Sequence, residues 1–364
     1  MDLARVHALA DFEPLARERM VPADYDYVAG GAWDERSLAD NEASWHRYRL
    51  RPRVLVDVAA VDPSTTLLGA RAAFPVATAP MAVHALAHPD GELGSARAAA
   101  AAGIPFTLST MSSRSIEAVA EATPGGTNWF QLYMQATEAQ SRGLVERAEA
   151  AGFRAIILTV DLPLLGYRVR DRRSGFELNV PLGNFLTEAT SGITGPTHRP
   201  DAGGYQALEA PPRRTLTWDD LATIRGWSSL PIVLKGILTA EDARLAVEHG
   251  VDGIVVSNHG ARQLDRVPAP VDVLEDVAAA VQGRAEVWVD GGVRSGLDIA
   301  TALALGANGV LVGRPILWAL AAGGQAGVER ALAILRDQFE IALALLGTPT
   351  GGDITRAHVL APVS

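Results

Sequence analysis

One short segment of the chain combines side chains that can move a proton and hold an anion. SNHGARQLD, Ser257 to Asp265, follows the apolar run GIVV and contains His259 and Arg262 three positions apart. A suitably placed imidazole can act as a general base, and a guanidinium can bind a carboxylate through two parallel hydrogen bonds. The segment therefore predicts proton abstraction from an anionic substrate.

Polar residues at the ends of two other apolar runs could complete this chemistry. Asp161 ends AIILTVD, with Arg168 seven residues later, and Lys235 closes PIVLK. Asp161 would raise the basicity of His259, Arg168 would join Arg262 in a carboxylate clamp, and a buried Lys235 would stabilise negative charge that develops on a cofactor. The alternatives are a satisfied core histidine, arginines that bridge to a loop, and an ion pair of Lys235 at the rim.

The last two apolar runs end in motifs that suit a phosphate group. EVWVDGGVRSG places Gly291, Gly292 and Arg294 after a strand, and GVLVGRP does the same with Gly313 and Arg314. Glycines let backbone N–H groups approach an anion closely, and arginine can bind it through two hydrogen bonds. Either motif alone is commonly a plain turn, but the pair predicts a phosphate-bearing ligand.

Eight short apolar runs must position these residues. Their starts lie 22 to 33 residues apart with one exception, and Ala-rich amphipathic stretches that end in Gly separate them. The runs are PVATAP (75–80), PFTLST (105–110), NWFQLYM (128–134), AIILTVD (155–161), PIVLKG (231–236), GIVVSNHG (253–260), EVWVDGG (286–292) and GVLVGRP (309–315). This pattern predicts an α/β fold, a (β/α)8 TIM barrel whose active site lies at the carboxyl ends of the strands. A doubly wound sheet is the alternative, but no glycine fingerprint follows the first run.

The exception is the long interval after the fourth strand. Residues 171–213 are rich in Gly, Pro, Thr and charge without clear periodicity, which is typical of a functional loop or a disordered insertion. We interpret them as a lid over the barrel mouth. Residues 1–65 read as a mostly helical segment and 66–364 as the barrel, so 1–364 is predicted to be a single domain.

Composition excludes several classes of protein. The 364 residues carry a net charge of −10 and contain no cysteine, which argues against nucleic acid or an anionic membrane as partner and rules out thiolate chemistry. The N-terminus does not resemble a signal peptide, and no apolar run could span a bilayer, so we expect a cytoplasmic protein. His84 and His88 have an i, i+4 spacing, but no nearby acidic or histidine set completes a site, and we predict no metal.

SNHGARQLD resembles the diagnostic motif of the FMN-dependent α-hydroxy acid oxidases and dehydrogenases. The similarity covers nearly the whole chain, through YDYVAGGA, NEASWHRYRLRPRVLVDV, AHPDGE, WFQLYMQ, LTVDLPLLGYRVRD, LKGILTAEDARLAVEHG, DGGVRSGLDIATALALGA and GVLVGRP. It implies an EC 1.1.3-type enzyme that converts an (S)-2-hydroxy acid to the 2-keto acid, with O2 giving H2O2. It also implies a homotetramer.

The resemblance further implies a role for each matching residue. The FMN site would comprise Pro80, Met81, Ala82, Ser109, Gln131, Thr159, Lys235, Ser257, Asp290, Gly291, Gly292, Arg294, Gly313 and Arg314. The substrate site would comprise Tyr27, Met111, Tyr133, Arg168 and Arg262, and the catalytic set His259 as base with Asp161, Tyr133 and Lys235. Whether His259 takes its proton from the hydroxyl or from Cα stays open.

Two departures from the glycolate oxidase pattern bear on the substrate. Met111 replaces a Trp and Met81 replaces a Thr, and LSTMSSRSIE is closer in type to mandelate dehydrogenase and hydroxymandelate oxidase. A smaller, flexible side chain opens room for a bulky acid. We therefore expect (S)-4-hydroxymandelate or mandelate as substrate, with a role in aryl-glycine antibiotic biosynthesis, and lactate or glycolate is the alternative. Three other hypotheses stay open: an electron acceptor other than O2, decarboxylation by a monooxygenase route, and a non-enzymatic flavin-binding barrel.

Overall fold

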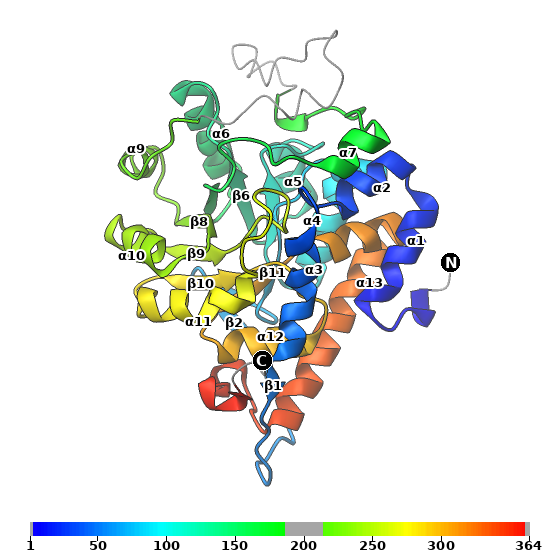
Figure 1. Cartoon of the computed structure of the whole chain (residues 1–364), viewed down its shortest axis with the longest axis vertical. Helices are drawn as coiled ribbons and strands as arrows, with labels where there is room; N and C mark the ends of the chain where they lie inside the picture. The colour runs from blue at the N-terminus through cyan, green and yellow to red at the C-terminus, as the bar shows by residue number, and fades with distance from the viewer. Residues whose placement is uncertain (1–2, 186–213, 361–364) are drawn as a thin grey trace.

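Eight parallel strands form a ring at the centre of the computed structural model, which describes residues 3–185 and 214–360 (Figure 1). All eight predicted strands are present. They are β4 (Val76–Thr78), β5 (Phe106–Ser109), β6 (Asn128–Leu132), β7 (Ile156–Thr159), β8 (Ile232–Ile237), β9 (Gly253–Val256), β10 (Glu286–Val289) and β11 (Gly309–Val312). From β5 to β11 each strand pairs with the next one in the chain, and β11 pairs with β4.

The ring closes between β4 and β5 with fewer bonds than elsewhere. The N–H of Thr78 donates to the carbonyl oxygen of Pro105 at 3.1 Å. Met81, just after β4, forms an isolated parallel bridge with Leu108. The predicted TIM barrel is confirmed.

Helices follow the strands and surround the ring. They are α4 (Gly91–Ala101), α5 (Ile116–Ala122), α6 (Glu138–Ala150), α7 (Val169–Ser174), α9 (Asp220–Arg225), α10 (Ala240–Glu248), α11 (Pro270–Val281), α12 (Gly296–Ala304) and α13 (Arg314–Leu346). Ser115, Thr137, Thr239 and Ser295 cap four of them by accepting a backbone N–H, as short hydroxyl side chains commonly do. Within the described ranges, no helix is long and apolar enough to cross a membrane.

The segment before the barrel is helical only in its first part. It contains α1 (Phe12–Arg19), α2 (Pro22–Ala29) and α3 (Arg36–Ala43); α1 packs on α13, and α2 lies beside α7 (Figure 1). Short 3-10 turns occur at Leu3–Arg5, Leu9–Asp11 and Ser44–Arg47. From there the chain is extended or irregular: β1 (Arg49–Leu50) pairs with β12 (Val359–Leu360), and the hairpin of β2 (Thr65–Leu67) and β3 (Ala70–Ala72) precedes β4.

Inward-facing residues change character along each strand. Trp129 and Trp288 lie inside the barrel with their rings in a T-shaped contact at 5.0 Å. Two residues further along the same strands stand Gln131 and Asp290, which are also buried. Side chains alternate between the two faces of a strand, so residues two positions apart share the inner face. Along these two strands the barrel interior is therefore apolar toward the amino ends and polar toward the carboxyl ends.

The predicted lid is only partly a loop. Its first residues form α7 and a 3-10 turn at Gly183–Phe185, and Phe176 between them is buried with its ring stacked on Tyr27 at 4.3 Å. The amide of buried Asn184 donates to the carbonyl oxygens of Ser109 and Thr110. Such contacts between distant segments leave no periodic pattern, which is why sequence reading missed this order. The remaining part, 186–213, lies outside the described residues.

Candidate active site

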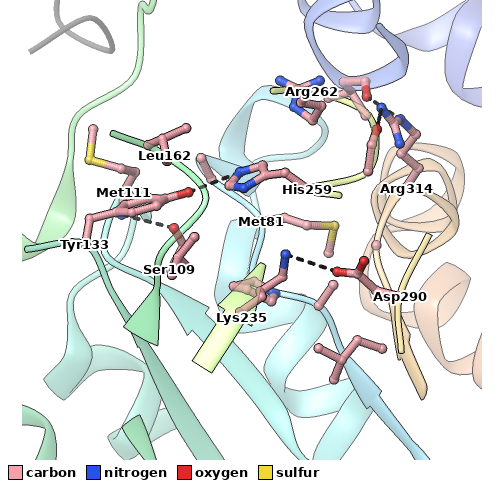
Figure 2. Close-up of a pocket in the computed structure, with 18 of the residues that line it drawn as sticks. Met81, Ser109, Met111, Tyr133, Leu162, Lys235, His259, Arg262, Asp290 and Arg314 are labelled. Atoms are coloured by element: carbon pink, nitrogen blue, oxygen red, sulfur yellow. Dashed lines mark hydrogen bonds and ion pairs between the residues drawn. The ribbon is translucent and has the colours of Figure 1, made fainter. Parts of the chain in front are cut away.

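A cavity of about 570 Å³ opens at the carboxyl ends of the strands (Figure 2). Its wall takes residues from the loops after seven of the eight strands, from Lys235 within β8, and from Tyr27 and Val28 of α2. Its volume is typical of sites for a cofactor together with a small ligand. The N-terminal helical segment therefore supplies one side of the mouth.

His259 lies between a carboxylate and a phenol. Its Nδ1 is 2.8 Å from Oδ1 of Asp161, and its Nε2 is 3.3 Å from the hydroxyl oxygen of Tyr133. Burial lowers the pKa of His259 despite the opposing charge and hydrogen bond of Asp161. Burial alone would raise the pKa of Asp161, but His259 and Lys235 hold it below its usual value. We infer a neutral imidazole beside an ionised carboxylate, the protonation state that a general base requires.

Tyr133 keeps its proton in this environment. Burial, followed by the negative charge of Asp161, raises the pKa of Tyr133 well above its usual range. A protonated phenol can donate a hydrogen bond to an oxygen of a ligand.

Two backbone irregularities make this arrangement possible. A bulge in β8 between Lys235 and Ile237 contains Gly236 at φ 116°, and a β-carbon there would lie 2.6 Å from the side chain of Asp161. Only glycine fits this approach. His259 itself has φ 60°, and its N–H donates to Oγ of Ser257 at 3.0 Å.

Lys235 is a buried cation on the floor of the cavity. Its Nζ lies 3.1 Å from Oδ2 of Asp290 and donates to Oγ of Ser257 at 2.8 Å. Oδ1 of Asp290 is buried and has no hydrogen-bond partner among the residues that the structure describes. An orphaned buried acceptor of this kind marks a place where a bound molecule can donate a hydrogen bond.

Arg314 and Gly313 form a cationic corner at the opposite side from Tyr133 (Figure 2). The Arg314 guanidinium donates to the carbonyl oxygens of Val28, Gly30 and Gly260 at 2.8–3.1 Å. Burial and then nearby positive charges lower the pKa of Arg314. The charged form of Arg314 is therefore destabilised, and a bound anion would stabilise it.

The glycines after β10 fit beneath the N-terminal segment. Nε1 of Trp45 donates to the carbonyl oxygen of Gly291 at 2.9 Å. Gly292 has φ 87°, and a β-carbon there would lie 1.8 Å from the carbonyl oxygen of Asn41. Arg294 lines the cavity and pairs with Glu42 at 2.6 Å.

Arg168 and Arg262 meet around the ring of Tyr27. The Arg262 guanidinium lies 4.8 Å from the ring centroid and donates to the carbonyl oxygens of Tyr27 and Gly30. The Arg168 guanidinium lies 5.9 Å from the same ring, and its Nε donates to the carbonyl oxygen of Arg262. The two predicted clamp arginines and Tyr27 are therefore neighbours.

Most residues predicted to contact the cofactor line the cavity, but two lie behind its wall. Ser109 and Thr159 face it, while Gln131 lies between them, accepting from Ser109 Oγ at 3.1 Å and donating to Thr159 Oγ1 at 3.1 Å. Ser257 is fully buried, and its Oγ accepts hydrogen bonds from Nζ of Lys235 and from the N–H of His259. It thereby holds the turn at residues 257–261, which we call the histidine turn.

Sequence reading missed several lining residues and one supporting pair. The apolar side of the cavity includes Leu162 and Leu165 as well as the predicted Met111. The loop after β6 and the first turn of α6 add Gln135, Ala136, Thr137 and Gln140. Asn258 exchanges two side-chain hydrogen bonds with Asn41, which ties the histidine turn to α3. These residue types are common in loops and helices, so the sequence alone does not indicate that they line or support a site.

The two histidines at i, i+4 spacing lie in different environments. His84 is buried with Nδ1 3.0 Å from Oγ of Ser95, whereas His88 is half-exposed. No cluster of three potential metal ligands occurs among residues 3–185 and 214–360.

Comparison with known proteins gives the family. The profile described as FMN-dependent dehydrogenase matches residues 16–361. The chain belongs to this family. It is 45% identical to glycolate oxidase 1 of Zea mays over 98% of this chain and 96% of the relative, and 48% identical to the L-lactate oxidase of a Nostoc species over 95% and 96%.

The fold comparison points the same way. A solved structure of mandelate oxidase with 3,3-difluoro-2-hydroxy-3-phenylpropionic acid matches with a TM-score of 0.88 at 44% identity, covering 98% of this chain and 100% of that one. Together the comparisons identify an FMN-dependent 2-hydroxy acid oxidase. The glycines and the cationic corner fit the phosphate of FMN, and the unpartnered Asp290 oxygen fits a hydroxyl donor such as those of its ribityl chain.

Proposed function

We propose that the protein oxidises an aromatic (S)-2-hydroxy acid, (S)-4-hydroxymandelate or mandelate, to the 2-keto acid with O2. The observation that carries this proposal is the position of His259, held by Asp161 and Tyr133 in a cavity with an apolar side. Figure 2 shows Met111 and Leu162 beside Tyr133, where they would pack against an aromatic ring. The similarity to a mandelate oxidase structure supports the same substrate class.

The cofactor roles follow from the polar half of the cavity. Lys235 would stabilise the negative charge of the reduced flavin, and Ser109 and Thr159 would bond its polar edge. The phosphate would lie at the glycines after β10 and at Gly313 and Arg314. When bound, FMN would supply the two-electron acceptor, and its reoxidation by O2 would yield H2O2.

The substrate roles follow from the cations beside His259. Arg168 and Arg262 would hold the carboxylate, with the phenols of Tyr27 and Tyr133 near its oxygens. His259 would take one proton from the substrate, and Asp161 would stabilise the imidazolium that results. The proton comes from the hydroxyl in one route and from Cα in the other, and both leave the geometry of the clamp unchanged.

A small aliphatic acid is the second candidate. The similar glycolate and L-lactate oxidases favour it, since their identity to this chain equals or exceeds that of the mandelate oxidase. Residues Met81 and Met111 are the positions at which the two candidates should differ most.

A panel of 2-hydroxy acids tests the proposal. The FMN-loaded protein is assayed with (S)-mandelate, (S)-4-hydroxymandelate, (S)-lactate and glycolate, and both O2 uptake and H2O2 yield are measured. We expect the highest kcat/KM with the aromatic acids and one H2O2 per keto acid. A higher value for lactate or glycolate would support the second candidate, and fast dye reduction without H2O2 would indicate another electron acceptor.

We also propose that four copies assemble in solution. Val54 and Leu55 are 82% and 104% exposed, next to the end of α13, where Ile341 and Leu345 are exposed one turn apart. Apolar side chains gathered in this way favour a contact with another copy. Light scattering on the eluting protein would measure the mass directly. A cytoplasmic location stays a prediction.

A further inference from the structure

Glu92, the second residue of α4, is a buried carboxylate that is not among the residues lining the cavity. It is fully buried, yet it accepts three hydrogen bonds. Its Oε1 accepts from the N–H of His84 at 3.0 Å and from the N–H of Ser113 at 2.8 Å, and its Oε2 accepts from the hydroxyl of Ser113. A buried carboxylate is stable only when such donors surround it.

The three donors come from two loops that both reach the cavity. His84 follows Met81 and Ala82 in the loop after β4, and Ser113 follows Met111 in the loop after β5. Glu92 is thus a single anchor for the two segments that carry the methionines of the cavity wall.

A second set of bonds couples the same loops directly. The N–H of Val83 donates to the carbonyl oxygen of Met111 at 3.1 Å, and the N–H of Ala85 donates to the hydroxyl of Ser113 at 3.3 Å. Any shift of one loop would therefore be transmitted to the other.

The backbone between Met81 and His84 needs this support. Val83 has φ 46°, a left-handed conformation that is strained for a β-branched residue. Strain of this kind persists only where surrounding contacts over-determine it. The hydrogen bond from the next residue, His84, to Glu92 is one such contact.

We propose that Glu92, acting with Ser113, is a positioning residue that sets the separation of Met81 from Met111 and thereby tunes both FMN retention and substrate selection. Its carboxylate touches neither ligand and acts through the two loops. The substrate part of this inference rests on the function proposed above, whereas the FMN part does not.

Three variants test the anchor at graded strength. Glu92→Ala removes both acceptor oxygens, Ser113→Ala removes one link, and Glu92→Gln keeps a carbonyl oxygen for the two backbone donors. For Glu92→Ala we expect FMN to dissociate from the holoenzyme about tenfold more readily, since the loops lose several hydrogen bonds. The kcat/KM ratio of (S)-mandelate to glycolate should also change, by less in Ser113→Ala, and Glu92→Gln should restore both.

Glu286→Ala serves as the matched control. Glu286 is a half-buried carboxylate that also accepts a loop N–H, from Leu68 at 2.8 Å, but at the opposite end of the barrel. Its loss should lower Tm without altering FMN release, flavin absorbance or the substrate ratio.

FMN release is followed by flavin fluorescence on dilution, and the visible spectrum reports the flavin environment. If Glu92→Ala and Ser113→Ala lower Tm as the control does but leave the spectrum, the release and the ratio unchanged, the role is only structural and the proposal is wrong. If Glu92→Ala does not fold, Ser113→Ala decides by the same readouts. If the unaltered protein oxidises neither acid, the proposed function fails, and FMN release still tests the anchor.

Discussion

The two ends of the barrel interior are built from the same strands but differ in character: one is packed and apolar, and the other is polar and adjoins the cavity. At the amino end, the inward-facing residues are apolar and in contact, with Trp129 against Trp288 and Leu67 of the preceding hairpin nearby. At the carboxyl end, the inward-facing residues two positions later are Gln131 and Asp290, and they adjoin a cavity. One end stabilises the fold, and the other holds buried polar groups that burial alone would disfavour.

The difference shows how a barrel separates stability from chemistry. Lys235 and Asp290 can stay buried because they pair with each other, and the strands that carry them are fixed by the apolar end. Variants at the amino end should therefore lower stability with little change in rate, and variants at the carboxyl end should do the reverse.

Removal of the base should give the largest effect. In His259→Ala the protein should fold and stay yellow, while flavin reduction by substrate slows about 10³-fold, the usual contribution of a general base. Anaerobic stopped-flow at the flavin absorbance measures the rate. Near-normal reduction would refute the assignment, and His249→Ala, which alters a histidine stacked on Trp218 away from the cavity, is the control.

A large deletion at the apolar end should show the opposite behaviour. Trp288 is 1% exposed, and Trp288→Ala should lower the free energy of unfolding by about 3–5 kcal/mol because a cavity is left behind. Urea unfolding measures this loss. The folded fraction should still reduce its flavin at close to the unaltered rate; a loss of rate as large as in His259→Ala would show that the two ends are not separable.

Change of the apolar wall should alter substrate choice but not chemistry. Met111→Trp fills space beside Tyr133 and should lower kcat/KM for mandelate about tenfold, the usual result of overpacking, with a smaller loss for glycolate. Steady-state kinetics with both acids measures the ratio. Equal losses would mean that Met111 does not shape the pocket.

The smallest effect concerns pH. Burial lowers the pKa of His259 from its usual 6.5, so the neutral base persists into mildly acidic solution and is lost only as pH falls through the lower pKa. The rate of flavin reduction should therefore be half-maximal below pH 6.5. A midpoint above that value would show that Asp161 outweighs burial.

Much of the fold could be predicted because buried parallel strands leave near-continuous apolar runs. The same reasoning found His259, Asp161 and Lys235, since chemistry-bearing residues directly follow such runs. Their predicted roles remain to be tested.

Other features could not be found this way. The tie between Asn41 and Asn258, the packing of Phe176 on Tyr27 and the anchor at Glu92 join residues that are ordinary in type. Most are also far apart in the chain. Their structural roles depend on which segments of the chain come into contact, and the periodicity of the sequence does not reveal those contacts.

The central claim is that the polar end of this barrel oxidises an aromatic 2-hydroxy acid. The most direct measurement mixes the FMN-loaded protein with (S)-mandelate without O2, follows the flavin absorbance, and then admits O2. The account predicts rapid bleaching, full recovery of the absorbance and one H2O2 per phenylglyoxylate formed. A flavin that stays oxidised with (S)-mandelate, while glycolate or lactate bleaches it, would contradict the account.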